Sequence, residues 1–176
     1  MSSRAAAIWV AVFLLLAIVG GGGLDLFDSG QDTITGAALG GRVVRVVDGD
    51  TVKIRLGDGR GTRTVRYIGV DTPESVKPGE PVQCFAKQAS EFNRRMVAGR
   101  RVRLRVGRER TDRYGRLLAY VYVQGKGRRF VNEELVRAGY ARTLEIAPNI
   151  DFARRFRALE RRARRAGRGL WRACER

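Results

Sequence analysis

Apolar and polar positions alternate along the first stretch of the chain that is suited to a folded domain. Residues 42–47, 51–56 and 62–68 are rich in β-branched side chains and are separated by short turns of Asp and Gly, a pattern that predicts three strands joined by hairpins. Residues 69–82 contain three prolines and show little periodicity, so we expect a loop there.

After this loop the apolar spacing changes to a helical period. Residues 83–98 repeat apolar side chains every three to four positions, and two further strands are predicted at 101–106 and 117–123. Helical patterns return at 131–138 and 150–166. Five short strands interrupted and followed by helices predict an α+β fold, a five-stranded Greek-key barrel of the OB type with three packed helices. Such barrels commonly hold oligonucleotides, although a fold alone does not define a function.

A long apolar run precedes these elements. Residues 5–24 are uncharged and mostly apolar, and a helix of that length spans about 30 Å, the thickness of the hydrocarbon core of a bilayer. Arg4 precedes the run and aspartates follow it, which favours a cytoplasmic N-terminus and export of the remainder. We expect an N-terminal hydrophobic helix in residues 1–24 that is either a transmembrane signal-anchor or a cleaved signal peptide, with a buried core helix as a third interpretation. The folded domain would then face outside the cytoplasm at the cell membrane, or be secreted.

Residues 25–40 are polar and without sustained periodicity, so they are expected to be a flexible linker before a folded domain at 41–176. Export would place Cys84 and Cys174 in an oxidising compartment, where two cysteines of one domain often pair. Two unpaired thiols are the alternative.

Charge and composition narrow the chemistry. The 176 residues include 35 Lys and Arg, 18 Asp and Glu and no histidine, for a net charge of +17. The lack of histidine excludes Ser-His-Asp and Cys-His hydrolysis and His-ligated zinc, and two cysteines are too few for an all-cysteine zinc site. Any metal must therefore be held by oxygen. The positive excess, which is densest in the arginines of residues 154–176, favours nucleic acid or an anionic membrane surface as a partner, while an arginine-rich proteome would produce a merely solvated surface.

Three polar clusters lie in the predicted connections. They are Asp48-Gly49-Asp50-Thr51, Asp71-Thr72-Pro73-Glu74 and Asp112-Arg113-Tyr114-Gly115-Arg116. Each alone is typical of a turn. Together with Arg66 they supply carboxylates for a hard cation such as Ca²⁺, a carboxylate that can deprotonate water, and two guanidiniums that can clamp a phosphate. The set suits phosphodiester hydrolysis and needs no histidine.

The segments that contain these clusters resemble the staphylococcal nuclease (thermonuclease) family. The matching segments lie between about residues 42 and 171 and are VVDGDTVKIRL, VRYIGVDTPE, TDRYGRLLAY and VNEELVRAGYA, followed by a Pro-Asn before the last helix. The resemblance implies an OB barrel with three helices and Ca²⁺-dependent cleavage of DNA and RNA.

The resemblance also implies a metal site. Asp50 and Asp71 would be carboxylate ligands of Ca²⁺, and Thr72 would contribute its backbone carbonyl. Asp48 would support the water shell of the metal.

The remaining site residues would act on the substrate. Glu74 would be the general base, or would orient the attacking water, and Tyr114 would contact the substrate. Arg66 and Arg116 would bind the scissile phosphate and stabilise its transition state. We expect no small organic cofactor and a monomeric protein.

The chain departs from the family pattern just before Pro148. Two tyrosines of the best-known member are replaced by Leu144 and Ile146, a change that could weaken base stacking by roughly 1–3 kcal/mol per base. The preference for DNA or RNA and for particular bases is therefore open, and Tyr140 or Tyr122 could compensate.

The main alternative function is a catalytically silent OB-fold module, anchored at the membrane, that binds nucleic acid or a protein. Degenerate copies of this barrel typically lose the acidic and arginine residues. The presence of the complete set in this chain favours the enzyme.

Overall fold

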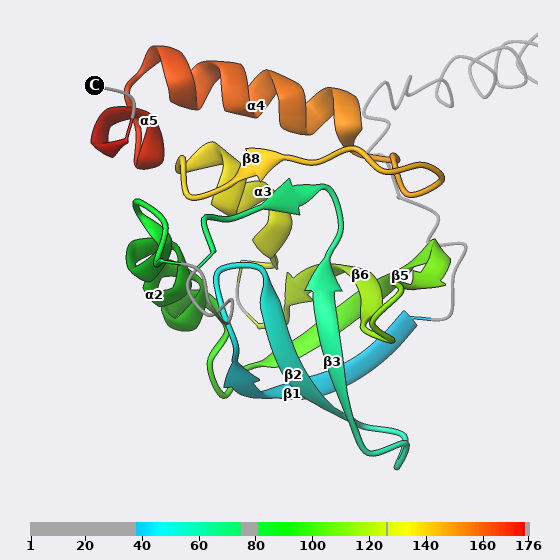
Figure 1. The fold of residues 1–176 in the computed structure, drawn as a ribbon. Coiled ribbons are helices and arrows are strands. Elements are labelled where there is room, and N and C mark those ends of the chain that lie inside the picture. Colours follow the sequence, from blue (N-terminus) through cyan, green and yellow to red (C-terminus); the bar gives the residue numbers. More distant parts are fainter. Residues whose placement is uncertain (1–37, 75–80, 126, 175–176) are drawn as a thin grey trace, which may run out of the picture. The chain divides into compact units, whose positions relative to one another are not determined.

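The computed structural model describes residues 38–74, 81–125 and 127–174, and its centre is a closed β-barrel (Figure 1). Five strands form the barrel: β1 (Ala38–Val46), β2 (Thr51–Leu56), β3 (Thr62–Tyr67), β5 (Arg101–Thr111) and β6 (Leu117–Val123). Neighbouring strands pair antiparallel in the order β3-β2-β1-β5-β6, and a parallel pairing of β3 with β6 closes the barrel. The expected OB-type α+β fold is confirmed.

Strand β2 shows why the sequence forms this barrel. Val52, Ile54 and Leu56 are buried in the core, whereas Lys53 and Arg55 between them are exposed. Successive side chains of a strand point to opposite faces, so this alternation buries one face of β2 and leaves the other in solvent.

Strand β1 begins three residues before the expected start of the domain. Ala38 and Leu39 pair with Arg105 and Leu104 of β5, so the end of the predicted linker 25–40 belongs to the sheet.

Three short strands were not expected. They are β4 (Val70–Asp71), β7 (Arg129–Phe130) and β8 (Arg142–Thr143). β7 extends the sheet beside β6, while β4 and β8 form a separate ladder in which Asp71 lies opposite Arg142. The β4–β8 ladder matters for function because it fixes the second polar cluster, in the predicted loop 69–82, against the segment that follows α3.

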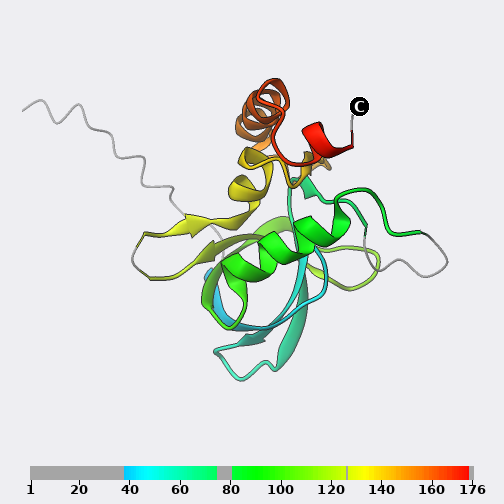
Figure 2. The same ribbon diagram turned by 90° about the vertical axis from the view of Figure 1, so that its left-hand side faces the viewer.

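Helices cover part of the barrel. The three expected helices are α2 (Ala86–Val97), α3 (Val131–Arg137) and α4 (Ala153–Arg165), and a short α5 (Leu170–Ala173) follows them. α4 runs above α3 and β8 in Figure 1, and Figure 2 shows α2 lying across one side of the barrel.

Cys84 and Cys174 form a disulfide, as one interpretation of the sequence predicted. The bond joins residues 90 positions apart and ties the segment before α2 to the residue after α5.

Among the residues that the structure describes, no helix is long and apolar enough to cross a membrane. The hydrophobic segment predicted in residues 1–24 lies outside the described residues, as does the linker before residue 38.

Candidate active site

Asp50 is the buried centre of the candidate site. It lies in the turn between β1 and β2, where its backbone N–H donates to Asp48 Oδ1 at 3.0 Å. Asp50 Oδ2 accepts two hydrogen bonds from Thr72, one from the backbone N–H at 2.9 Å and one from the hydroxyl at 3.0 Å. Gly49 permits this approach, because a Cβ there would lie 2.5 Å from Thr72 Oγ1. The first two predicted clusters therefore meet at one carboxylate.

Arg66 links the two carboxylates that were expected to bind metal. Its Nη1 lies 2.7 Å from Asp50 Oδ2, and its Nη2 lies 2.9 Å from Asp71 Oδ1. Nη1 also donates to the carbonyl of Val70 at 2.9 Å. Arg66 stands opposite Thr51 in the β2–β3 ladder, which holds the guanidinium beside the Asp50 turn.

Negative charge exceeds positive charge at this point of the molecule. Burial raises the pKa of Asp50 to about 6, with Arg66 acting to lower it and Asp48 to raise it further. Burial raises the pKa of Asp71, while Arg66 and Arg142, the residue opposite Asp71 in the β4–β8 ladder, act to lower it. Two guanidiniums thus face the three carboxylates of Asp48, Asp50 and Asp71, and a cation would offset the remaining charge.

The available donors fit a hard cation. Within the described residues no group of three or more acidic, Cys or His side chains is arranged to hold a metal, so Asp50 and Asp71 would need backbone and water oxygens as additional ligands. Ca²⁺ accepts such a mixed set, since it takes roughly six to eight oxygen ligands in flexible geometry. The Asp71 side chain is 54 % exposed, which gives solvent access to the site.

Glu74 is held by its backbone to the segment that leads into α2. Its N–H donates to Gln83 Oε1 at 2.9 Å, and its carbonyl accepts the N–H of Gln83 at 3.0 Å. The Glu74 side chain is half-buried. Gln83 has no role in the sequence-based prediction, because nothing in the local sequence indicates a contact between residues nine positions apart. The residue after Gln83 is Cys84, which forms the disulfide with Cys174.

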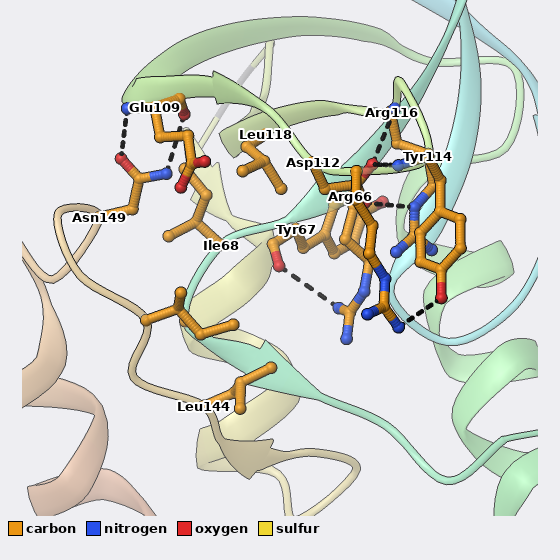
Figure 3. Close-up of a pocket in the computed structure, with 13 residues that line it drawn as sticks. Arg66, Tyr67, Ile68, Glu109, Asp112, Tyr114, Arg116, Leu118, Leu144 and Asn149 are labelled. Atoms are coloured by element: carbon orange, nitrogen blue, oxygen red, sulfur yellow. Dashed lines mark hydrogen bonds and ion pairs between the residues drawn. The ribbon is translucent and has the colours of Figure 1, made fainter.

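The third cluster lines a cavity of about 420 Å³ (Figure 3). Arg66 and Arg116 both line it, so the structure brings together the two arginines expected to bind phosphate. Arg116 Nε donates to Asp112 Oδ2 at 2.6 Å, and Asp112 Oδ1 accepts the backbone N–H groups of Tyr114 and Arg116. Burial acts to raise the pKa of Asp112, but these hydrogen bonds hold it below its usual value.

Asp112 therefore orients Arg116, a role that sequence reasoning missed. The signal was present, since an Asp four residues before an Arg in a tight turn can bond both the arginine side chain and the backbone N–H groups of the turn.

An aromatic ring and an aliphatic surface complete the cavity. Tyr114 is 66 % exposed, and its ring centroid lies 4.8 Å from the guanidinium carbon of Arg113 and 5.2 Å from that of Arg116. Leu144 and Ile146, the replacements for the family's tyrosines, line the same cavity.

Neither tyrosine that could have compensated lines this cavity. Tyr140 stacks on Phe92 with ring centroids 4.0 Å apart, and Tyr122 stacks on Phe130 at 4.6 Å. Both of these rings pack against other aromatic side chains, so among the residues that line the cavity the exposed aromatic ring is that of Tyr114.

Asn149 fixes the segment that contains Leu144 and Ile146. Its Oδ1 accepts the N–H of Glu109 at 3.2 Å, and its Nδ2 donates to the Glu109 carbonyl at 2.9 Å, as Figure 3 shows. A Cβ at Gly107 would lie 2.6 Å from Asn149 Oδ1, so glycine is required beside it. The sequence marked Asn149 only as part of a Pro-Asn pair.

A closed OB-type barrel that gathers acidic residues and two arginines at one side is the arrangement that the resemblance to a nuclease family implies. A family model described as "Staphylococcal nuclease homologue" matches residues 64–173. A thermonuclease of Staphylococcus hyicus is 40 % identical over 130 residues, which cover 74 % of each chain, and a thermonuclease of Staphylococcus intermedius is 42 % identical over 129 residues, 73 % of this chain and 74 % of the relative. Endonuclease YncB of Bacillus subtilis (strain 168) is 40 % identical over 129 residues, 72 % of this chain and 59 % of the relative. The chain belongs to the staphylococcal nuclease family.

Proposed function

We propose that this chain, a nuclease of the staphylococcal nuclease family, is a Ca²⁺-dependent endonuclease that hydrolyses DNA, RNA or both outside the cytoplasm. The observation that supports this most directly is the contact of Arg66 with both Asp50 and Asp71, beside a cavity that Arg66 shares with Arg116. The curated relatives named thermonuclease and endonuclease agree with it.

Arg66 and Arg116 would bind the oxygens of the scissile phosphate. Guanidiniums suit this role because they hold two oxygens at once and stabilise the charge that develops in the transition state. Each arginine is oriented by a carboxylate, Arg116 by Asp112 and Arg66 by Asp50 and Asp71, so neither side chain has to be ordered when substrate binds.

Glu74 would orient a water molecule and accept its proton as the water oxygen forms a bond to phosphorus. The bond from phosphorus to the leaving oxygen then breaks, and the leaving oxygen takes a proton from solvent. Gln83 holds the backbone of Glu74 at both its N–H and its carbonyl, which limits movement of the base.

Asp50, Asp71 and the carbonyl of Thr72 would hold Ca²⁺. Asp48 would support this site by accepting the N–H of Asp50, which fixes the turn. When bound, Ca²⁺ supplies positive charge beside the phosphate.

Two features support the proposed location. The apolar segment in residues 1–24 predicts a membrane anchor or a signal peptide, and a disulfide between Cys84 and Cys174 is typical of proteins in oxidising compartments. We propose that the nuclease domain acts outside the cytoplasm as a monomer, either tethered to the membrane or secreted. Mass spectrometry of the mature chain will show whether the segment is retained.

The test is degradation of single-stranded DNA by the full chain in detergent. We expect cleavage with Ca²⁺, none in excess chelator, and a loss of at least hundredfold for Glu74→Gln. Glu91→Gln, the same change at an exposed position of α2, is the matched control and should keep full activity. Cleavage that persists in chelator or in Glu74→Gln would refute the mechanism.

A further inference from the structure

The outer face of the barrel carries like charges opposite one another on neighbouring strands. Arg55 of β2 lies opposite Arg42 of β1, and Lys53 lies opposite Arg45. Arg42 also lies opposite Arg101 of β5. Side chains in such positions have Cβ atoms only about 5 Å apart, so these five cations form one cluster across three strands. We call it the basic sheet face.

The described part of the chain gives this cluster no acidic partner. All five side chains are exposed, and none forms an ion pair with a described Asp or Glu. Arg42 Nη1 donates to the carbonyl of Gly99 at 2.7 Å, which orients the guanidinium without neutralising it. Other arginines differ: Arg60, for example, is paired with Asp58.

Like charges directly opposite each other destabilise a sheet. The arrangement is therefore a cost to the free protein, and binding of a multiply charged anion would relieve it. A single small anion would neutralise only part of a cluster that spans three strands.

The basic sheet face is continuous with the candidate active site along β3. Thr62, Thr64 and Arg66 occupy alternate positions of β3 and therefore share a face. Thr62 is opposite Arg55, and Thr64 is opposite Lys53. A polyanion with one phosphate at Arg66 can thus place its next phosphates over the cluster, which favours a nucleic-acid strand as the occupant.

The chemistry of the face predicts how the strand is recognised. Its five members are cationic, and none has an aromatic ring on which a base could stack. A hollow of about 450 Å³ beside Arg45 is also lined by Arg94 of α2, whose charge is paired with Glu91. Such a surface contacts the sugar-phosphate backbone and does not read the sequence.

We propose that the basic sheet face is a second nucleic-acid contact, which binds the backbone of the substrate beyond the scissile phosphate. This inference rests on the proposed function for the identity of the substrate. Binding at the face requires neither Ca²⁺ nor Glu74, so it can be measured where no cleavage occurs.

The experiment measures binding of a fluorescein-labelled single-stranded 20-mer to the full chain in detergent and chelator, by anisotropy, between about 50 and 200 mM salt. The variant is Arg42→Gln/Arg55→Gln/Arg101→Gln. Three lost phosphate contacts should reduce the slope of log affinity against log salt by about 2 and weaken binding more than tenfold at low salt. Arg161→Gln/Arg162→Gln/Arg165→Gln removes the same charge from exposed positions of α4, within the arginine-rich segment that the sequence also associates with nucleic acid. If the strand lies over the sheet face and not over α4, this comparison variant should change affinity by less than about threefold.

Equal weakening in both triple variants would show that binding follows net charge alone and would overturn the inference. An unchanged salt slope in the sheet variant would overturn it too. Loss of binding to phosphatidylserine vesicles in the sheet variant, with DNA binding intact, would assign the face to a membrane instead. Urea unfolding checks the fold: the loss of the hydrogen bond from Arg42 to Gly99 opposes the relief of like-charge repulsion, so the unfolding midpoint of the sheet variant should stay close to that of the parent.

The two proposals can fail separately. If the parent chain binds DNA through the face in chelator but never cleaves with Ca²⁺, the proposed function falls and this inference stands. If the parent chain cleaves with Ca²⁺ but both triple variants bind DNA alike, this inference falls and the proposed function stands.

Discussion

Asp50 should make the metal-free protein less stable as the pH rises from about 4 to about 6. Its side chain is almost fully buried, and burial raises its pKa from an ordinary 3.8 to about 6 in the folded chain. The folded state therefore holds the proton more tightly than the unfolded state. This stabilisation is complete below the unfolded pKa and is lost as the pH passes the folded pKa.

The raised pKa of Asp50 determines how much stability the metal-free protein loses. A pKa difference of about two units corresponds to on the order of 3 kcal/mol between the protonated and ionised forms. Ionised Asp50 should therefore lower the free energy of unfolding of the metal-free protein by about that amount at pH 7. Such a loss is a large share of the stability of an ordinary domain.

The assay is urea unfolding of the parent and of Asp50→Asn in chelator, between pH 4 and pH 7. Carboxylates remote from Asp50, such as Asp112, whose lowered pKa acts in the opposite direction, are present in both proteins and largely cancel. Burial and Asp50 both act to raise the pKa of Asp71, so Asp71 contributes in the same direction as Asp50. The stability of Asp50→Asn relative to the parent should rise by about 3 kcal/mol across this range. A difference that is flat or falls with pH would refute the argument.

Calcium provides an independent check on the same carboxyl. Because a metal ligand must be deprotonated, Ca²⁺ would compete with the proton for Asp50 if this carboxyl binds the metal as proposed. Titration calorimetry should find the apparent Kd for Ca²⁺ rising about tenfold per pH unit below about pH 6. A Kd that is constant from pH 5 to pH 7 would remove Asp50 from the metal site.

Three further variants test other parts of the molecule. Cys84→Ala/Cys174→Ala opens a loop of 90 residues and should lower the free energy of unfolding by about 4 kcal/mol in urea. Arg116→Ala should reduce kcat at least a hundredfold and lower the free energy of unfolding by less than about 1 kcal/mol, because the side chain is partly exposed in a turn. A loss of stability large enough to account for the loss of kcat would mean a structural role. Leu144→Tyr/Ile146→Tyr should tighten nucleotide binding by about 1–3 kcal/mol if both rings stack, which fluorescence titration would show.

Local patterns predicted the barrel because its strands bury one face and expose the other. β2 and β6 have the predicted bounds, since their ends coincide with turns and with the limits of apolar runs. β5 continues to Thr111, well beyond the predicted end at residue 106, because polar residues still pair with β6 across an irregularity in the ladder. Alternation of apolar and polar residues could not reveal that extension, since neither face of residues 107–111 is buried in the core.

The parts of the site that sequence reasoning missed are contacts between distant residues. Gln83 holds Glu74, and Asn149 holds Glu109 across 40 positions, yet each is an ordinary polar residue in its own segment. The resemblance to a family could transfer roles only to positions that its motifs contain. Asp112 lies inside a motif, but the motif does not show that its carboxylate accepts from Arg116 Nε, because that contact depends on how the turn folds.

Unfavourable charges of both signs lie on β2 and in the turn immediately before it. Asp50, immediately before β2, is a buried carboxyl that resists ionisation, and Lys53 and Arg55, on β2 itself, lie opposite other cations. Both arrangements oppose the stability of the free chain. Each is relieved by a different component of the proposed reaction: a divalent cation at the carboxylates, and a chain of phosphates over the arginines. If the proposed metal and nucleic acid bind there, each would raise the stability of the folded chain, and β2 is the strand at which the two effects meet.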